Sequence, residues 1–535
     1  MNAPVTPARG GVLQRLFGAR IRVAFLLCTV GFAWTVGQFY QPTTGFTSLL
    51  MIGDAMEANQ VTRLREVPHY RYKDSVGYDG AYYVQLALYP SLDNPELSQA
   101  IDNLPYRARR VLFGWVAWLL GLGQPAWVVQ AQALLNVLCW FALAWVLTRW
   151  FPPTTGGNFL RWAGILFSHG VCMSARDSLV DGPALLLVAL AMAWIEDGRR
   201  GRAVAMLALG GLGKETSLLA AAGLADGLLP PSRRAWWRFA GLGLVVALPL
   251  AVWIGYVRWK FGPVADPGYG NFTLPLIGLA EKWGAALSDL TDDSRSFMIW
   301  ATFLAVLGVT VQMIFILARW RPRELWWRVG ASFAGMAVFL SKPVWEGYPG
   351  AFTRVLLPMA LAFNFLVPRG RAWLPVLIAG NLSVLAGFNE FSPPAREFFQ
   401  VHGDSAIVAK LQVRADGWHG LENAGGRRWR WSAGSSVLVV RNQSDRAVAL
   451  TFSGKLRGER AGRALRIAIG AQTLWSGTLT EDRVEAGFGC VVPPGETTLA
   501  FTTDRPPNFI GVDPRLLAFS LTNLAIVVAP VSDQR

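Results

Sequence analysis

Repeated apolar runs separated by short arginine-rich turns constrain this chain more than any other feature. Hydrophobic residues make up 53% of its 535 residues and charged residues only 16%, below the roughly 25% usual for soluble domains. A first run spans 21–36, and ten more lie near 127–148, 158–175, 182–195, 203–213, 216–229, 239–257, 297–317, 328–341, 354–367 and 372–388. We therefore predict a polytopic α-helical membrane protein with about 11 membrane segments.

The positions of the arginines predict how these runs are threaded. When the runs alternate across the membrane, every dense Arg cluster falls on one side; the clusters lie at 149–161, 199–202, 233–238, 319–328 and 369–371. Lys and Arg are enriched in cytoplasmic loops, so this side is expected to be cytoplasmic, together with a tail over 1–20. The same pattern accounts for the formal charge of +15, and no nucleic-acid partner is expected.

Polar segments fall on the opposite side in this threading. They are a large first outer loop over 38–126, the turns 175–182 and 213–217, the loop 258–296, and the segment 341–354. Within the first loop, the apolar piece 111–122 is too short to span a bilayer, so we place it at the interface or as a re-entrant element. An odd number of segments places the C-terminus outside.

After residue 388 the composition changes to short β-type runs separated by Gly, Asp, Asn and Pro. Turn residues at a spacing of about 8–12 residues are typical of a β-sandwich or jelly roll. We expect one extracytoplasmic domain of this kind over 405–535. Four tryptophans in it could stack on sugars or belong to its core: Trp418, Trp429, Trp431 and Trp475.

The segment GYDGAYYVQLALYP of the first outer loop contains the best candidate for catalysis, Asp79. Tyr78 and Gly80 flank this acid, and the aromatic Tyr83 follows at a spacing that suits one face of a helix. A carboxylate here could act as general base on an acceptor hydroxyl. The alternative is that Asp79 caps the N-terminus of a helix.

Two further outer turns combine charges of both signs. ARDSLVDG holds Arg176, Asp177 and Asp181, and because the two acids are four residues apart, one helical face could carry both. GKETS holds Lys214 and Glu215, and Lys214 could meet a phosphate. The alternatives are a surface turn with a capped helix and a buried Lys–Glu ion pair that fixes a hairpin. Acids at the end of a membrane helix are costly without a partner or a function.

Cations also appear in two other outer segments. Lys342 and Arg354 bracket WEGYPGAFTR, and Arg107 lies in IDNLPYRARR. An outer cation could hold a lipid phosphate, or an Arg there could extend to the lipid headgroups. The four Cys and four His show no ligand spacing, so we predict no metal site and no cofactor, and a divalent metal is unsupported.

Five of these strings, in this order over roughly 20–390, resemble the GT-C superfamily of membrane glycosyltransferases. Within it, the chain looks most like members that form bacterial cell-surface glycopolymers. The resemblance implies a GT-C-like transmembrane domain over 21–390. The strings are GYDGAYYVQLALYP, IDNLPYRARRVLFGW, ARDSLVDGPALLL, GKETSLL and AFTRVLLPMALAFN.

The resemblance also implies a reaction. Such enzymes take a sugar from a polyprenyl-phosphate donor and pass it, generally with inversion, to a glycan or glycolipid acceptor on the outer face of the bacterial inner membrane. Asp79 matches the expected base, Asp177 and Asp181 match the acidic turn, and cations at the remaining matched positions are expected to support phosphate or acceptor: Arg176, Lys214 and Arg354. Many members carry two neighbouring acids in the first loop, whereas Asp79 stands alone. The C-terminal domain resembles carbohydrate-binding modules sometimes appended to such enzymes.

Two other functions remain open from the sequence. A transporter or flippase of lipid-linked glycans would place its polar site near the bilayer midplane and often shows a repeated half; no repeat is visible here. A non-catalytic glycan-assembly protein would use the C-terminal domain as its working part. Membrane lipids are expected partners in all three cases.

Overall fold

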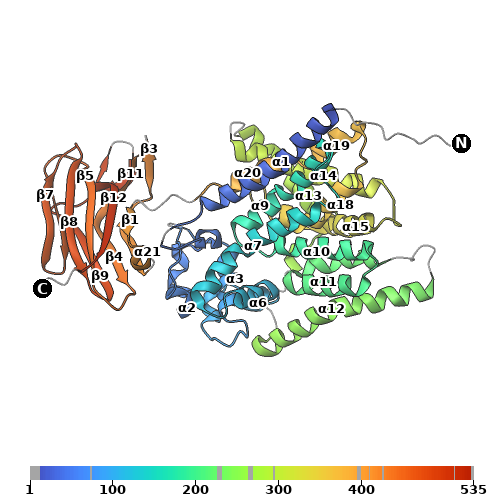
Figure 1. The fold of residues 1–535 in the computed structure, drawn as a ribbon, viewed down its shortest axis with the longest axis horizontal. Coiled ribbons are helices and arrows are strands. Elements are labelled where there is room, and N and C mark those ends of the chain that lie inside the picture. The colour runs from blue at the N-terminus through green and yellow to red at the C-terminus, as the bar shows by residue number, and fades with distance from the viewer. Residues whose placement is uncertain are drawn as a thin grey trace. The chain divides into compact units, whose positions relative to one another are not determined.

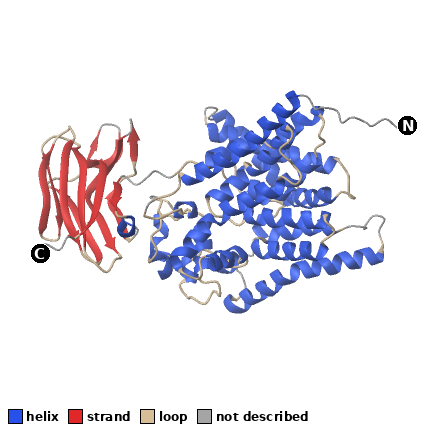
Figure 2. Ribbon diagram, in the orientation of Figure 1, coloured by secondary structure: helices blue, strands red, loops and turns tan. Residues whose placement is uncertain are grey.

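Helices and strands separate into two units along the chain. The computed structural model describes residues 12–41, 43–72, 75–225, 232–262, 269–292, 296–393, 399–408, 410–424, 427–510 and 513–531. One unit comprises Met1–Phe39, Phe46–Val67 and Asp74–Pro393, and the other Tyr40–Gly45, Pro68–Lys73 and Pro394–Arg535. Helices form the first unit and strands dominate the second (Figure 2). Residues 1–11 of the predicted tail lie outside the described residues, and the first helix begins at Val12.

The first unit is built from α-helices and a few short 3-10 helices. Its first half contains α1 Val12–Gly37, η1 Thr47–Leu50, η2 Asp54–Asn59, α2 Thr62–Arg65, α3 Asp79–Leu88, α4 Leu97–Ala100, α5 Leu104–Arg107, α6 Leu112–Leu120, α7 Pro125–Leu147, α8 Gly156–Leu166, α9 His169–Arg176 and α10 Asp181–Glu196. Its second half contains α11 Arg200–Gly213, η3 Glu215–Leu224, α12 Arg233–Phe261, η4 Tyr269–Asn271, α13 Ile277–Asp292, α14 Phe297–Ala318, α15 Leu325–Phe339, α16 Lys342–Trp345, α17 Phe352–Val355, α18 Leu357–Leu366, η5 Arg371–Trp373, α19 Leu374–Gly380 and α20 Val384–Glu390.

Few of these helices are long enough to cross a membrane. Among the described residues, four are long and apolar enough by length and composition, and a pair bent by 43° brings the number to five if it forms one span. They are Ala19–Gly37 of α1, α7, α12 and α14, with α19 and α20 as the bent pair. The predicted count of about 11 segments is therefore not confirmed.

The difference arises because an apolar run does not show where a helix breaks. The run 158–175 divides into α8 and α9, and the run 216–229 begins as the 3-10 helix η3, with 226–229 outside the described residues. The helix α10 has 16 residues, which at 1.5 Å per residue gives about 24 Å. The prediction that 111–122 is too short to span agrees with the nine residues of α6.

The core of the first unit surrounds α7, which packs against α3, α6, α8, α9 and α10. Aromatic rings fill the space between α1, α7 and α8: Phe32 stacks on Trp140 with centroids 3.8 Å apart, and Trp162 meets both Trp140 and Phe25. This packing supports the elements that carry the polar residues described below.

Several arginine-rich turns meet at one end of this unit. Glu196, at the end of α10, accepts hydrogen bonds from the indoles of Trp150 at 2.7 Å and Trp326 at 3.0 Å. Arg149 forms an ion pair with Asp197 at 2.6 Å. These contacts bring together the chain after α7, the chain after α10 and the start of α15.

The helix α10 separates this end from the predicted outer turns. It begins at Asp181 and ends at Glu196, and α11 returns from Arg200 to Gly213, directly before Lys214. Figure 1 shows α10, α11 and α12 as neighbouring helices. The acidic turn and the GKETS turn therefore lie together, about one length of α10 away from the arginine-rich turns.

The second unit is a β structure with two layers joined by one long strand. Its elements are β1 Phe399–Gly403, α21 Ser405–Val408, β2 Leu411–Trp418, β3 Glu422–Ala424, β4 Arg427–Asn442, β5 Val448–Gly458, β6 Arg463–Ile469, β7 Gln472–Leu479, β8 Val484–Val492, β9 Gly495–Thr503, β10 Asn508–Ile510, β11 Asp513–Leu517 and β12 Phe519–Pro530. The strand order is β7-β6-β9-β4-β12-β5-β8. The first part of β4 pairs with β12, and its later part pairs with β2 and β9.

The prediction of a helical region followed by a β region is thus confirmed at the level of fold class. Trp418 and Trp431 are buried, and the ring of Trp418 packs edge-on against Phe501 and Phe519 in the core. For these two tryptophans the core interpretation holds. Trp429 and Trp475 are only partly buried.

Candidate functional site

The N-terminus of α3 lies directly against the acidic turn because residue 80 is glycine. A Cβ atom there would collide with the carbonyl oxygen of Asp177 and would lie 2.9 Å from that of Leu50. Tyr78 is the N-cap residue and Asp79 is the first residue of the helix. The predicted alternative, Asp79 as the capping residue itself, is therefore wrong.

Asp79 is held by an arginine that it shares with a second acid. Its Oδ1 atom lies 2.9 Å from Nη1 of Arg107, which also binds Asp102 at 2.9 Å. The guanidinium of Arg107 lies over the ring of Tyr82, 4.9 Å from its centroid. The side chain of Asp79 is 23% exposed and that of Arg107 is 12% exposed. The carboxylate is thus oriented by a cation and still accessible from outside the protein.

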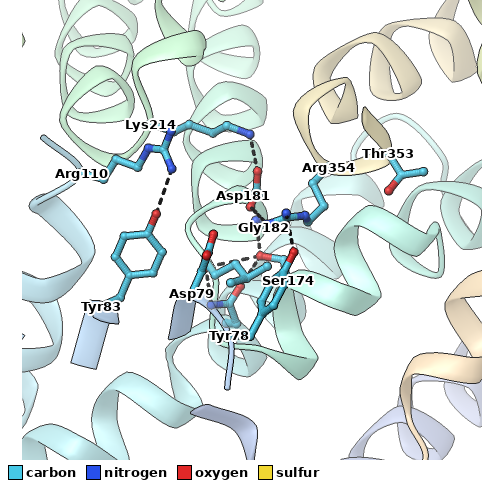
Figure 3. A network of polar contacts seen from close by, with 12 residues as sticks. Tyr78, Asp79, Tyr83, Arg110, Ser174, Asp181, Gly182, Lys214, Thr353 and Arg354 are labelled. Carbon is cyan, nitrogen blue, oxygen red and sulfur yellow. Dashed lines mark hydrogen bonds and ion pairs between the residues drawn. The ribbon is translucent and has the colours of Figure 1, made fainter. Parts of the chain in front are cut away.

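Asp181 lies at the centre of a buried network next to Asp79 (Figure 3). Its two oxygens meet Nζ of Lys214 and, at 3.4 Å, Nη1 of Arg354. Nη2 of Arg354 donates to the hydroxyl of Tyr78 at 2.9 Å. The Nε atom of Arg354 is buried and has no hydrogen-bond partner among the described residues. Arg354 therefore does not extend to the headgroups, contrary to the alternative considered from the sequence.

Glu215 belongs to a neighbouring ion pair that the sequence did not reveal. Arg110 binds both of its carboxylate oxygens, at 2.9 and 2.8 Å, and also donates to the hydroxyls of Tyr83 at 2.9 Å and Tyr106 at 3.0 Å. The suggested Lys214–Glu215 pair is therefore wrong, since Lys214 forms its ion pair with Asp181 and Glu215 forms its ion pair with Arg110. A pocket beside Arg110, lined partly by Tyr83, has a volume of about 10 Å³, room for about one water molecule.

The acidic turn is a break between two helices, so its two acids do not share one helical face as predicted. Asp177 caps the C-terminus of α9, Ser178 has φ of 49°, and Asp181 begins α10. The hydroxyl of Ser174 accepts from the amide of Gly182 at 2.7 Å and fastens the turn internally.

Asp177 and Arg176 lie at the edge of the network. Nη1 of Arg176 is 3.6 Å from Asp177 Oδ1 and donates to the carbonyl of Ser48 at 3.2 Å. Burial raises the pKa of the Asp177 carboxyl to about 7, although the charge of Arg176 lowers it and Asp79 adds a smaller increase. Burial likewise raises the pKa of Tyr78 to about 12, so its phenol stays protonated and can donate as well as accept.

Most of the predicted residues therefore lie in one place although they come from five separate segments. The charges of Asp79, Asp177 and Asp181 all act on the guanidinium of Arg354. Lys342 is the exception: its side chain is 69% exposed and, within the described part of the chain, its ion pair is with Glu346, four residues away. Sequence reasoning missed Asp102 as the partner of Arg107.

The site contains five cations and five carboxylates, and each carboxylate forms an ion pair with one of the cations. The cations are Arg107, Arg110, Arg176, Lys214 and Arg354, and the carboxylates are Asp79, Asp102, Asp177, Asp181 and Glu215. Among the described residues there is no group of three His, Cys, Asp or Glu side chains that could hold a metal ion. What the arrangement provides is partly exposed carboxylates, among them that of Asp79, beside fixed positive charge.

Comparisons with known proteins give low similarities. No family model matches the sequence, and no curated protein matches it. Among solved structures, arabinosyltransferase EmbB from Mycobacterium smegmatis is similar over 83% of this chain and 62% of its own, with 10% identity and a TM-score of 0.27. A family 29 carbohydrate-binding module, CBM29-2 with mannohexaose, is similar over 22% of this chain and 81% of its own, with 13% identity and a TM-score of 0.15. These values do not assign the chain to a family.

Proposed function

We propose that this protein is a membrane glycosyltransferase of the GT-C type that transfers a sugar from a polyprenyl-phosphate donor to a cell-surface glycan or glycolipid acceptor. One observation carries the proposal. Asp79, Asp181, Lys214 and Arg354 meet at the end of α10 that lies away from the arginine-rich turns. A carboxylate beside cations at one end of the helical unit suits a reaction at a membrane surface.

The chemistry requires one base and a stable leaving group. Asp79, whose partly exposed carboxylate is held by Arg107, would remove the proton of the acceptor hydroxyl. The phosphate of the donor departs with the electrons of the glycosidic bond, and fixed cations stabilise the charge that develops on it. Arg354 is suited to this role because its guanidinium is held in place by Asp181 and Tyr78 and feels the charge of Asp79. The lipid tail remains in the bilayer, so the enzyme mainly has to position two substrates.

The sequence favours this function over transport, because transporters often show a repeated half and no repeat is visible in this chain. The charges of the site lie at the ends of two helices, since Asp181 is the first residue of α10 and Lys214 directly follows α11. In the proposed orientation this end faces the outside of the bacterial inner membrane, with the β unit on the same side. There the partly buried Trp429 and Trp475 are the tryptophans that could contact glycan.

The test is sugar transfer by Asp79→Asn in membranes, measured as the release of polyprenyl phosphate from a panel of labelled polyprenyl-phosphate sugars. We expect a loss of at least about a hundredfold, the size of a general-base contribution. Asp102→Asn is the matched control, because Asp102 binds the same Arg107 but its side chain is 45% exposed. It should lose far less activity. Equal activity of Asp79→Asn and wild type would overturn the assignment of the base.

A further inference from the structure

Beside the site, a buried histidine connects three elements of the first unit. His169 is 1% exposed. Its Nδ1 atom lies 2.7 Å from the hydroxyl of Thr353, and its Nε2 atom lies 3.2 Å from Oε1 of Glu390. Thr353 directly precedes Arg354 in α17 (Figure 3). His169 is thus one side chain removed from a cation of the proposed site.

The hydrogen bonds of Thr353 decide the direction of this chain. Its hydroxyl has one proton and donates it to the carbonyl of Gly350 at 3.0 Å. The same oxygen must therefore accept from His169, which places a proton on Nδ1. The hydrogen bond between Nε2 of His169 and Oε1 of Glu390 then requires one more proton, which is carried either by the imidazole or by the carboxyl group. Each group in the chain from Glu390 to Gly350 has its hydrogen bond satisfied.

Close backbone packing keeps this chain in place. A Cβ atom on Gly170 would collide with the carbonyl of Thr353 and would lie 3.0 Å from the Cα of Arg354. A Cβ atom on Gly387 would collide with the carbonyl of Phe167 and approach the amide of His169. The helices α9, α17 and α20 therefore touch through glycines, and small movements of His169 are transmitted to α17 because packed interiors yield little.

We propose that His169 is a positioning residue that sets the place of Arg354 through Thr353. Both of its ring nitrogens are engaged within the protein, with Thr353 and Glu390, so we place it outside the reacting groups. Its effect on sugar transfer rests on the proposed function, but its effect on α17 does not. An arginine displaced by about 1 Å can cost about a hundredfold in rate, which is why a residue outside the reacting groups matters here.

Two matched pairs of substitutions test this proposal. The amide of Asn reaches the position of Nδ1, whereas the amide of Gln reaches that of Nε2, so His169→Asn keeps the bond to Thr353 and His169→Gln loses it. Thr353→Ser keeps the hydroxyl, and Thr353→Val removes it at nearly constant shape. Asn381→Ala is the control for general loss of packing. The side chain of Asn381 exchanges hydrogen bonds with Asn364 in α18 and takes no part in the hydrogen bonds of His169 and Thr353.

The first readout is backbone hydrogen exchange over residues 350–356 in the purified full chain, which needs no substrate. We expect His169→Gln and Thr353→Val to speed exchange there by about tenfold or more, and their partners and Asn381→Ala to change it little. Unchanged exchange in His169→Gln and Thr353→Val overturns the proposal. If His169→Gln and Thr353→Val both fail to fold, His169→Asn and Thr353→Ser still test the proposal. Failure of these two variants to fold as well would contradict a role for the hydrogen bond of Thr353.

The second readout is coupling in the transfer assay. If His169 acts through Arg354, then His169→Gln should cost about tenfold to a hundredfold in wild type and much less in an Arg354→Lys background. Equal costs in the two backgrounds overturn the proposal. Absence of transfer by the wild-type protein contradicts the proposed function alone, since the exchange result is independent of it.

Discussion

The buried charges around Asp181 give the most quantitative prediction. The side chains of Asp181, Lys214 and Arg354 are 5%, 8% and 10% exposed. Asp181→Asn keeps the size of the side chain but leaves two buried cations without their counter-ion. Removing one partner of a buried ion pair costs about 3–5 kcal/mol of unfolding free energy, and we expect a loss of this size.

The assay is unfolding of the purified protein in detergent micelles, followed by tryptophan fluorescence, for Asp181→Asn, Lys214→Met and the double variant. Because the two residues share one ion pair, the double variant should lose less than the sum of the single losses, with a coupling of about 1–3 kcal/mol. Additive losses, or a loss for Asp181→Asn below about 0.5 kcal/mol, would refute the reasoning that this pair is buried and mutually dependent.

Two further predictions follow from the acidic turn. Burial raises the pKa of Asp177 to about 7, so between pH 4 and 7 the folded protein binds a proton that the unfolded chain releases, and stability falls as the pH rises through this window. In the wild-type protein the unfolding free energy should therefore fall by a few kcal/mol between pH 4 and 7, at roughly 1.4 kcal/mol per pH unit, and Asp177→Asn should remove this fall. Parallel curves of thermal midpoint against pH for Asp177→Asn and wild type would contradict this. Gly80→Ala forces a methyl group against the carbonyl of Asp177 and should cost about 1–3 kcal/mol and most of the transfer activity. The control is Gly201→Ala in α11, where a Cβ meets open space, and it should be neutral or stabilising by about 0.5–1 kcal/mol. Similar losses of stability in the two glycine variants would contradict the close approach of α3 to the acidic turn.

The sequence predicted the kind of residue in the site better than the partner of each residue. Composition indicated helices and then strands, and acids and cations beside apolar runs marked Asp79, Asp181 and Arg354. The pairing of Arg110 with Glu215 spans 105 residues, and that of His169 with Glu390 spans 221. Such contacts depend on which helices pack together, and a single sequence contains no direct record of that.

The same limit explains the errors in the fold. Apolar content shows that 158–175 is buried or membrane-embedded, but the break between α8 and α9 depends on the packing of α9 against α17 and α20. The turn at Ser178 likewise separates Asp177 from Asp181, although their spacing suits one helix. Local pattern predicts the elements, whereas tertiary contacts decide where they bend.

The account depends most on the two ends of the helical unit facing opposite sides of the membrane. After replacement of its four cysteines, the protein would receive a single cysteine at the exposed Lys342 or at the exposed Arg371. A membrane-impermeant maleimide added outside intact spheroplasts should label the cysteine at position 342 and leave that at 371 unlabelled until the membranes are inverted. Labelling of both positions from the same side, or of 371 alone from outside, would contradict an extracytoplasmic site.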